Sequence, residues 1–266
     1  MVSIADLDDG DAVPEPLQSL PDAGWSRVLC VVAHPDDMEY GTSAAVATWT
    51  RRGVEVTYLL LTAGEAGMAE APEIVKPLRQ QEQRRACETV GVSDLRILDH
   101  HDGMVEYGLA LRRDIARVVR QVRPDAVIGG VFDVEAWGML NQADHRAAGL
   151  ATIDAVRDAD NPWVFRELAE QEGLAPWHTT ALLISGHETP THGIAVDEDA
   201  VQASVASLRS HEAYLKHVTG HPDPGEFIPE MLREGGRALG SEYAVVFRVF
   251  DLGGVGGSGH EEPAAS

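Results

Sequence analysis

The chain has 266 residues, of which 44% are hydrophobic and 24% are charged, and this is the composition of a globular protein with a sizeable core. Its 43 Asp and Glu residues outnumber its 21 Lys and Arg residues, so the formal net charge is −22. Such a charge disfavours nucleic acid and anionic membrane surfaces as partners. No apolar stretch reaches the ~18 residues of a membrane span, and we expect no membrane insertion.

The two ends of the chain differ in composition from the part between them. Residues 1–24 are acidic and lack the basic segment and long apolar stretch of a classical signal peptide, so they predict a flexible arm. Residues 252–266 are Gly-rich and acidic and are expected to be disordered, which leaves 25–251 as one domain. Two cysteines, Cys30 and Cys87, indicate no disulfide framework and favour a reducing, cytoplasmic location.

Apolar runs and helical periodicity alternate along the chain. Residues 27–33 and 54–61 are too continuously apolar for strands exposed on one face, so they predict buried parallel strands. Between them, 38–52 has apolar residues at helical spacing and ends before Gly53. Similar patterns predict helices at 76–90, 109–122, 145–157, 198–217 and 226–238, and strands at 95–98, 125–131, 180–185, 193–196 and 243–250. The alternation predicts a single doubly wound, Rossmann-like α/β fold with a mostly parallel sheet and helices on both faces.

Two clusters of ionisable residues follow predicted strands. Doubly wound sheets bind ligands beyond the carboxyl ends of their strands, usually between the first and the fourth strand. The first strand of "VLCVVAHPDDMEYG" runs into His34, Asp36 and Asp37, and the fourth leads into "NQADHRAAG" with Asp144 and His145. We therefore expect both clusters beside one crevice.

Three residues of these clusters form a set that suits a catalytic zinc ion, namely His34, Asp37 and His145. Asp36 would then lie near the metal without coordinating it and could accept a proton from water as a general base. The same ligands also suit Fe²⁺ and other divalent ions. As an alternative, one of the two Asp residues could cap the helix that follows.

Five short motifs occur in a recognisable order: "AHPDDME", "LTAGEAG", "RQQE", "HDGM" and "ADH". Together they resemble the LmbE-like, or PIG-L, deacetylase family across residues 27–215. The resemblance implies a zinc-dependent hydrolase that removes the N-acetyl group from an N-acetylglucosamine-type sugar or sugar conjugate. It places zinc on His34, Asp37 and His145, with Asp36 as the base that activates water.

By the same resemblance, Arg79 in "RQQE" and Asp102 in "HDGM" contact the substrate. Each residue also has a simpler interpretation. Arg79 could be a solvated helix residue, and Asp102 could form a turn before Gly103.

The sequence departs from the family pattern at two places. Relatives often have His-Pro-Asp-His where this chain has Gln142, Ala143, Asp144 and His145. The first His stabilises the oxyanion in relatives and is held by the Asp, so Gln142 or His192 is expected to replace it here, with Asp144 in a supporting position. His192 could instead be an exposed loop residue. Relatives also carry Glu directly after the two Asp, whereas here Met38 intervenes and Glu39 is the candidate for that supporting position.

Two other functions remain open. The chain could cleave a larger amide, such as a mycothiol S-conjugate, or it could be a catalytically silent sugar-binding relative. The expected partner is a small acetamido sugar or its conjugate, and a homo-oligomer is left open. Specificity is expected to lie in the loops at 66–77, 132–143 and 186–192, while His211 is expected to have a structural, hydrogen-bonded role.

Overall fold

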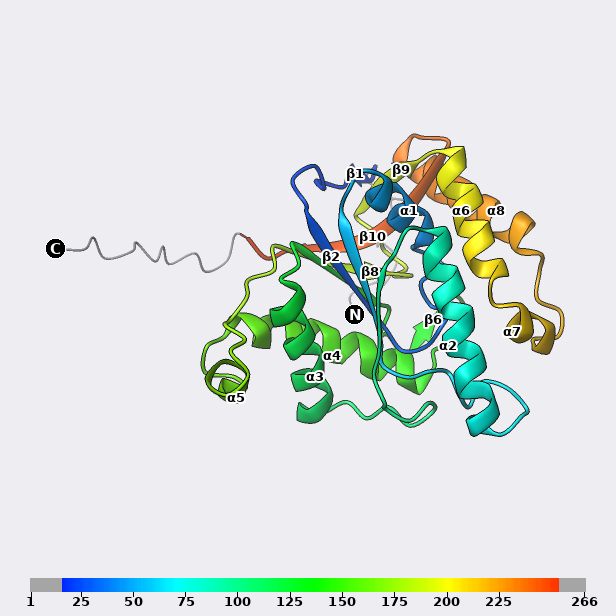
Figure 1. Cartoon of the computed structure of the whole chain (residues 1–266). Helices are drawn as coiled ribbons and strands as arrows, with labels where there is room; N and C mark the ends of the chain where they lie inside the picture. Colours follow the sequence, from blue (N-terminus) through cyan, green and yellow to red (C-terminus); the bar gives the residue numbers. More distant parts are fainter. Residues whose placement is uncertain (1–15, 254–266) are drawn as a thin grey trace, which may run out of the picture.

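The computed structural model describes residues 16–253 and contains a central eight-stranded sheet with helices on both faces (Figure 1). The strand order across this sheet is β1-β9-β10-β8-β5-β2-β3-β4. The strands are β1 (Gln18–Ser19), β2 (Arg27–Val32), β3 (Glu55–Leu60), β4 (Asp94–Ile97), β5 (Ala126–Gly130), β8 (Ala181–Ser185), β9 (His192–Val196) and β10 (Tyr243–Asp251). A separate hairpin consists of β6 (Glu135–Ala136) and β7 (Met139–Leu140).

The order of the parallel strands reverses between β2 and β5. The chain runs from β2 outward to β3 and β4 and then returns to β5 on the other side of β2, and all of these neighbours are parallel. β8 continues the sheet in parallel, whereas β10 is antiparallel to both β8 and β9. The predicted fold class is confirmed, and the reversal lies between the first and fourth main strands as expected.

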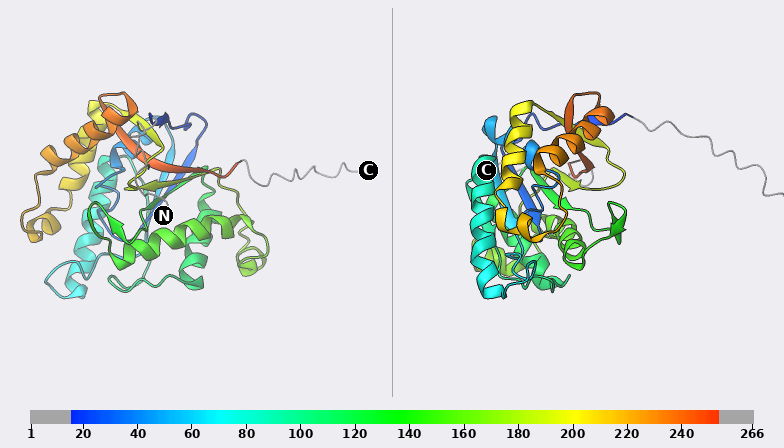
Figure 2. Two further views of the ribbon diagram at one scale, coloured as in Figure 1. Left: turned by 180° about the vertical axis from the view of Figure 1, so that it is seen from behind. Right: turned by 90° about the vertical axis from the view of Figure 1, so that its right-hand side faces the viewer.

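Two layers of helices cover the sheet (Figure 2). The helices are α1 (Ser43–Arg51), α2 (Pro72–Thr89), α3 (Leu109–Val122), α4 (Ala143–Asp160), α5 (Arg166–Glu170), α6 (Glu198–Arg209), α7 (Glu212–His217) and α8 (Pro224–Leu239). On one face, α1, α6 and α8 bury a core that includes Trp49 and Phe247, whose rings stack with centroids 6.4 Å apart. On the other face, α3 and α4 pack a second core around residues such as Ile115. The two buried faces explain why the central strands are continuously apolar.

Most predicted helices shift by a few residues at their ends, and two differ in more than that. The helix expected at 38–52 begins only at Ser43, because the residues after β2 form a series of turns. Its N-cap is Thr42, so neither Asp36 nor Asp37 caps it. The helix expected at 198–217 is divided into α6 and α7, and the fully buried His211 lies at the break.

The described part of the expected N-terminal arm is ordered, which corrects the sequence-based prediction there. β1 pairs in parallel with β9, and Asp22 accepts a hydrogen bond of 2.7 Å from the indole Nε1 of Trp49. The remainder of the arm, 1–15, and the tail from 254 onward lie outside the described residues. Cys30 and Cys87 are buried and form no disulfide, as expected.

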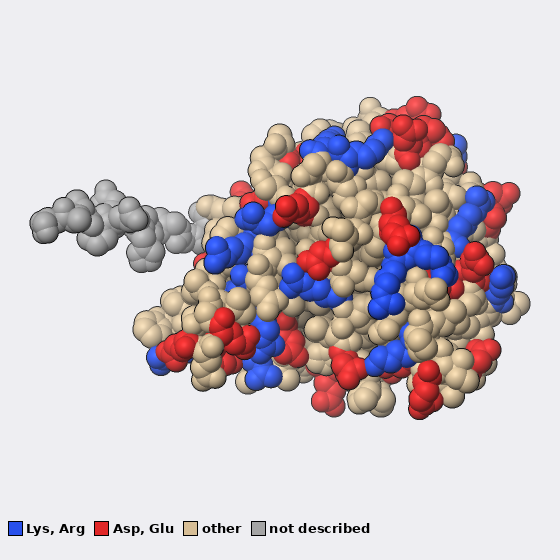
Figure 3. Space-filling view, viewed as in Figure 1, with Lys and Arg blue, Asp and Glu red and all other residues tan. Residues whose placement is uncertain are grey.

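Charged side chains of both signs are interspersed on the face seen in Figure 1, although the chain carries a large acidic excess (Figure 3). The acidic excess therefore forms no continuous patch on that face. Across residues 16–253, every helix is too short or too polar to span a bilayer.

Candidate metal centre and active site

The site is built on a turn that follows β2 at the point where the strand order reverses. His34, Asp36 and Asp37 lie on this turn, and the Asp37 carboxylate accepts a hydrogen bond of 2.9 Å from the backbone N–H of His34. Asp36 has a φ of 80°, a conformation that costs a non-glycine residue free energy and occurs preferentially at functional sites. The first turn of α4 brings Asp144 and His145 to the same place.

His34, Asp37 and His145 converge as predicted. Each can offer one ligand atom, and these atoms all lie within 4.8 Å of one another. The two oxygens of Asp37 face different histidines, with Oδ1 3.2 Å from Nε2 of His145 and Oδ2 3.7 Å from Nδ1 of His34. The centroids of the imidazole rings of His34 and His145 are 5.1 Å apart. This arrangement resembles the three protein ligands of a catalytic zinc site.

The hydrogen bonds around His145 assign its protonated nitrogen. Asn141 donates through Nδ2 to the carbonyl oxygens of Val131 and Asp133, so its Oδ1 faces the ring Nδ1 of His145 at 3.2 Å and must accept. The neutral ring therefore carries its proton on Nδ1. Its Nε2 is buried, has no hydrogen-bond partner and holds a lone pair that faces Asp37.

His34 has the complementary orientation. Its Nε2 lies 3.0 Å from Asp102 and 3.3 Å from Asp144, and both carboxylates can accept its proton. The lone pair of Nδ1 is then directed toward Asp37. A carboxylate behind a ligating histidine fixes the tautomer of the ring and strengthens it as a ligand.

The electrostatics of the cluster favour a cation. Burial alone would lower the pKa of His34, but Asp37, Asp102 and Asp144 outweigh it and raise that pKa well above its usual range. Burial likewise opposes the ionisation of Asp37, yet His145 and His34 hold its pKa far below the ordinary value. Two imidazole lone pairs and a carboxylate directed at one point are stabilised by a bound cation, so these residues fit a divalent metal ion.

A second group, His34, Asp102 and Asp144, is also close enough to hold a metal. Its carboxylates are already occupied, because Asp102 accepts from the backbone N–H of Ala66 and Asp144 accepts from those of Gly103 and Val105. His34, Asp37 and His145 are therefore the better candidates for metal ligands. The structure places Asp102 and Asp144 behind His34, where they orient it.

Asp36 combines burial with a free oxygen atom. Burial raises its pKa to about 7, while Arg79 lowers it and Asp37 raises it further. Nη2 of Arg79 is 3.2 Å from Oδ2 of Asp36 but donates its hydrogen bond to the carbonyl oxygen of Pro35 at 2.8 Å. Oδ2 makes this ion-pair contact but has no hydrogen-bond partner, although it is buried and Asp36 lines the cavity. Such an oxygen can accept a proton from water.

Arg79 is only 2% exposed and is not the solvated helix residue of the simpler interpretation. Its guanidinium lies 3.4 Å from Glu82 and 3.3 Å from Nδ1 of His211, and it stacks on the ring of Tyr214 at 4.0 Å. These contacts leave Arg79 directed at Asp36. The expectation that Arg79 contacts substrate stays a prediction.

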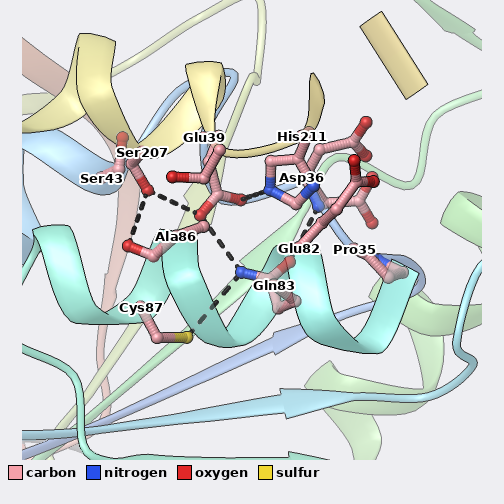
Figure 4. A network of polar contacts seen from close by, with 12 residues as sticks. Pro35, Asp36, Glu39, Ser43, Glu82, Gln83, Ala86, Cys87, Ser207 and His211 are labelled. Carbon is pink, nitrogen blue, oxygen red and sulfur yellow. Dashed lines mark hydrogen bonds and ion pairs between the residues drawn. The ribbon is translucent and has the colours of Figure 1, made fainter. Parts of the chain in front are cut away.

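A buried polar network continues behind Asp36 (Figure 4). The side chain of Gln83 accepts a hydrogen bond from the backbone N–H of Asp36 at 2.9 Å and donates to Glu39 at 3.2 Å. Ser207 also donates to Glu39, and Nε2 of His211 lies 3.8 Å from it. Glu39 is therefore linked to Asp36 through Gln83 and has no contact with the three ligands. His211 contacts Arg79 and Glu39, consistent with its expected structural role.

Gln142 and His192, the two candidates for the missing family histidine, have different positions. Gln142 is the N-cap of α4, is exposed and lines the cavity. His192 lies in β9, contacts Thr191 at 2.9 Å and is absent from the cavity lining. The structure thus does not bring His192 to the site. Its strand, β9, lies between β1 and β10 in the sheet, away from β2 and the turn that carries His34. His187, on the loop before it, lines the cavity instead.

Several residues of the site carried no clear signal in the sequence. Asn141 and Gln83 support His145 and Asp36, and Tyr214 covers Arg79. Asn141 precedes His145 by four residues, which was the one local indication of its contact. The other two come from α2 and α7, whose positions depend on tertiary packing.

A cavity of about 1200 Å³ opens over the site. We call the lining around the candidate metal ligands the inner part, and it consists of His34, Asp36, Asp37, Arg79, Asp102, His145 and Tyr214. We call the lining from the hairpin of β6 and β7, the loop after β8 and α8 the outer part. Pockets for small molecules usually have volumes of about 300–1,000 Å³, so this cavity has room for more than one sugar ring.

Comparison with known proteins gives related sequences and a related fold. The family model described as "PIG-L: GlcNAc-PI de-N-acetylase" matches residues 29–156. The diacetylchitobiose deacetylase of Thermococcus kodakarensis is 30% identical over 191 residues, which cover 70% of this chain and 69% of that protein. A probable N-acetyl-alpha-D-glucosaminyl L-malate deacetylase 2 of Bacillus anthracis is 34% identical over 138 residues, covering 49% of this chain and 59% of that protein.

Among solved structures, the N,N'-diacetylchitobiose deacetylase from Pyrococcus horikoshii superposes with a TM-score of 0.77 and 22% identity, and the match covers 87% of this chain and 86% of that one. This likeness supports the same fold. The matched sequence includes the turn after β2 and the start of α4, which carry the three ligand residues. The chain therefore belongs to the PIG-L, or LmbE-like, family of deacetylases.

Proposed function

We propose that the protein is a zinc-dependent deacetylase that removes the N-acetyl group from an N-acetylglucosamine-type sugar or sugar conjugate. The observation that carries this proposal is the convergence of His34, Asp37 and His145 beside the free oxygen of Asp36. The deacetylases of Thermococcus kodakarensis and Bacillus anthracis support the same chemistry, since both are named for removing acetyl groups from glucosamine derivatives.

The residues of the site divide the reaction between them. A metal ion held by His34, Asp37 and His145 would polarise the acetamide carbonyl and make a nearby water molecule more acidic. Asp36 accepts a proton as the water oxygen attacks the carbonyl carbon, and it delivers that proton to the nitrogen as the C–N bond breaks. The products are acetate and the free amine of the sugar.

Two further residues assist Asp36 and the carbonyl group. Arg79 stabilises the ionised form of Asp36, which must exist at the start of the reaction. Gln142 lines the cavity and can donate a hydrogen bond from its amide to the carbonyl oxygen as negative charge develops there. It can supply this dipole but no proton and no full charge.

The experiment is to incubate the purified chain with N-acetylglucosamine and N,N'-diacetylchitobiose and to measure the released primary amine with an amine-reactive dye. Treatment with a chelator should abolish the release, and restoring Zn²⁺ or Fe²⁺ to separate samples should identify the effective metal. Asp36→Asn should retain the metal and lose turnover, whereas His34→Ala and His145→Ala should lose both. Full activity in a metal-depleted sample would contradict the proposal.

The large cavity favours a second candidate, the cleavage of a larger amide such as that of a mycothiol S-conjugate. The same assay with such conjugates distinguishes the two, because the preferred substrate has the higher kcat/KM. Binding of sugars without amine release from any substrate would identify a catalytically silent relative.

A further inference from the structure

The outer part of the cavity has a different lining from the part around the metal ligands. The inner part contains the candidate metal ligands and Asp36, whereas the outer part includes apolar surface from Trp137 and Met139 of the hairpin, Gly186 of the loop after β8, and Phe227 and Met231 of α8. If the proposed function holds, the acetamido group of the substrate lies at the metal ligands. Whatever is attached to that sugar must then occupy the outer part.

Trp137 is held in a defined position at the boundary of the two parts. It is at the turn between β6 and β7 with a φ of 53°, a left-handed conformation that a bulky residue adopts only under constraint. Its indole ring packs against Gly186 so closely that a Cβ there would lie 2.9 Å from Cζ2. The ring also meets His145 edge to face, with centroids 6.3 Å apart and an interplanar angle of 87°.

Despite these contacts, Trp137 is 59% exposed. An aromatic side chain of this size is normally buried, and burying it stabilises a protein. Here Trp137 belongs to the lining of the cavity. A flat aromatic surface with a negative π face suits the C–H groups on the face of a sugar or another saturated ring. The strained backbone and the close contact with Gly186 keep this surface in place.

The outer part also carries negative charge. Among the described residues that line the cavity, Arg79 is the one arginine or lysine, and it is directed at Asp36. Carboxylates around the outer part come from Glu188, Glu226, Glu230 and Glu234. Glu230 is paired with Arg233 and Arg237 at 3.5 and 3.4 Å, while His187 lies 3.9 Å from Asp133. An anionic group in this part would therefore meet like charges and no free cation.

We propose that the outer part of the cavity binds the group attached to the acetamido sugar, that Trp137 stacks on this group, and that the group is an uncharged ring such as a second sugar. This inference rests on the proposed deacetylase function and names its class of substrate. It favours a substrate like the disaccharide in the name of the Thermococcus relative over a dicarboxylic acid conjugate like that in the name of the Bacillus relative.

The first test compares kcat/KM for N,N'-diacetylchitobiose and N-acetylglucosamine in the metal-loaded protein. We expect Trp137→Ala to lower the ratio of disaccharide to monosaccharide about fivefold to tenfold, mainly through KM, which is the worth of one aromatic stacking contact. Trp137→Phe should retain part of the preference. Leu140→Ala is the matched control, because Leu140 is on the same hairpin, is 77% exposed and is absent from the cavity lining. An unchanged ratio in Trp137→Ala would overturn the proposal.

The second test isolates charge with the phenyl and 4-carboxyphenyl glycosides of N-acetylglucosamine, which differ in one carboxylate. The wild type should prefer the phenyl compound, and Glu226→Gln combined with Glu234→Gln should reduce this preference about threefold, as expected for exposed charges. A wild type that prefers the carboxyphenyl compound would contradict the proposal.

Binding measurements separate this inference from the proposed function. Isothermal titration of Asp36→Asn with N,N'-diacetylchitobiose, with and without Trp137→Ala, reports on the outer part of the cavity without turnover. Tighter binding when Trp137 is present, together with a metal-loaded wild type that releases no amine from any substrate, would refute the deacetylase function and retain the inference. Amine release by the wild type, with no effect of Trp137 on binding, would support the deacetylase function and refute the inference.

Discussion

The ring Nδ1 of His145 lies 3.2 Å from the side-chain oxygen of Asn141, and this contact directs the opposite nitrogen of His145 toward Asp37. Asn141 is itself fixed, because it is 3% exposed and donates to two carbonyl oxygens. The geometry of the metal centre therefore depends on a residue that does not belong to it.

We predict that Asn141→Ala weakens metal binding about 10- to 100-fold, the usual effect of losing a partner behind a ligating histidine. The measurement is a competition titration of Zn²⁺ with a chelating dye. A thermal melt of the metal-free protein serves as the control, since the variant also loses hydrogen bonds of the loop. Wild-type metal affinity in a folded Asn141→Ala protein would contradict the assignment of Nε2 as the ligand atom.

The second prediction concerns Arg79 and the pH dependence of turnover. Burial raises the pKa of Asp36 and Arg79 opposes this rise, so replacing Arg79 by Met should raise the pKa further. The base must be ionised, and the acidic limb of the pH profile of kcat/KM should therefore move to higher pH. Arg79→Lys retains the charge and should move this limb less.

Removal of Arg79 also leaves Asp36 and Glu82 without their cation, and breaking such a buried pair typically costs about 3–5 kcal/mol of stability. The profile is consequently measured below the melting temperature of each variant. An acidic limb at lower pH in Arg79→Met would show that Arg79 does not act on Asp36.

The third prediction concerns stability and the buried carboxyl group of Glu39. Burial raises its pKa to about 7, whereas its pKa in the unfolded chain is near 4.5. Between these two pH values the folded protein therefore holds a proton that the unfolded chain has released. This contribution to stability is fully present below about pH 4.5 and is lost as the pH rises through 7. The side chain of Glu39→Gln cannot ionise, so this variant does not lose that contribution to stability as the pH rises. Its free energy of unfolding relative to the wild type should rise by about 1–3 kcal/mol between pH 5 and pH 8.

Urea unfolding at the two pH values measures the difference. His211 has the opposite tendency, since burial lowers its pKa to about 3 and the unfolded chain, with a pKa near 6.5, then binds a proton that the folded protein does not. Its contribution to stability is therefore present above about pH 6.5 and is lost as the pH falls from 6.5 toward 3. It is present in both proteins, so comparing them largely removes its contribution. A difference in stability that does not change with pH would mean that Glu39 ionises normally in the folded state.

The fourth prediction concerns Gln142, which is the N-cap of α4, lines the cavity and is expected from the sequence to replace the family histidine. If its amide stabilises the developing oxyanion, Gln142→Ala should lower kcat about 10- to 100-fold with little change in KM, toward the lower end of the effect of an oxyanion donor. Gln142→His should restore a hydrogen-bond donor and have a higher kcat than Gln142→Ala. An unchanged kcat in Gln142→Ala would assign that task to another group.

The local sequence determined most of the fold because the central strands are buried on both faces and helices such as α3 are buried on one. Such burial produces apolar runs and helical spacing that can be read without partners, and α3 appears at the predicted residues. The same local patterns placed the first ligand cluster after β2 and the second at the start of α4. Since parallel strands end at the same edge of a sheet, this was sufficient to predict that His34, Asp37 and His145 meet.

Tertiary structure decided what surrounds those ligands. His192 and His187 are five residues apart, yet His187 lines the cavity and His192, in β9, does not. Gln83 and Tyr214 reach the site from α2 and α7, whose orientation depends on long-range packing. The sequence by itself thus specified the candidate metal ligands and the candidate base, which follow strands and helix starts. The supporting partners, the free oxygen of Asp36 and the exposed indole of Trp137 depend on contacts between distant segments, which local spacing does not encode.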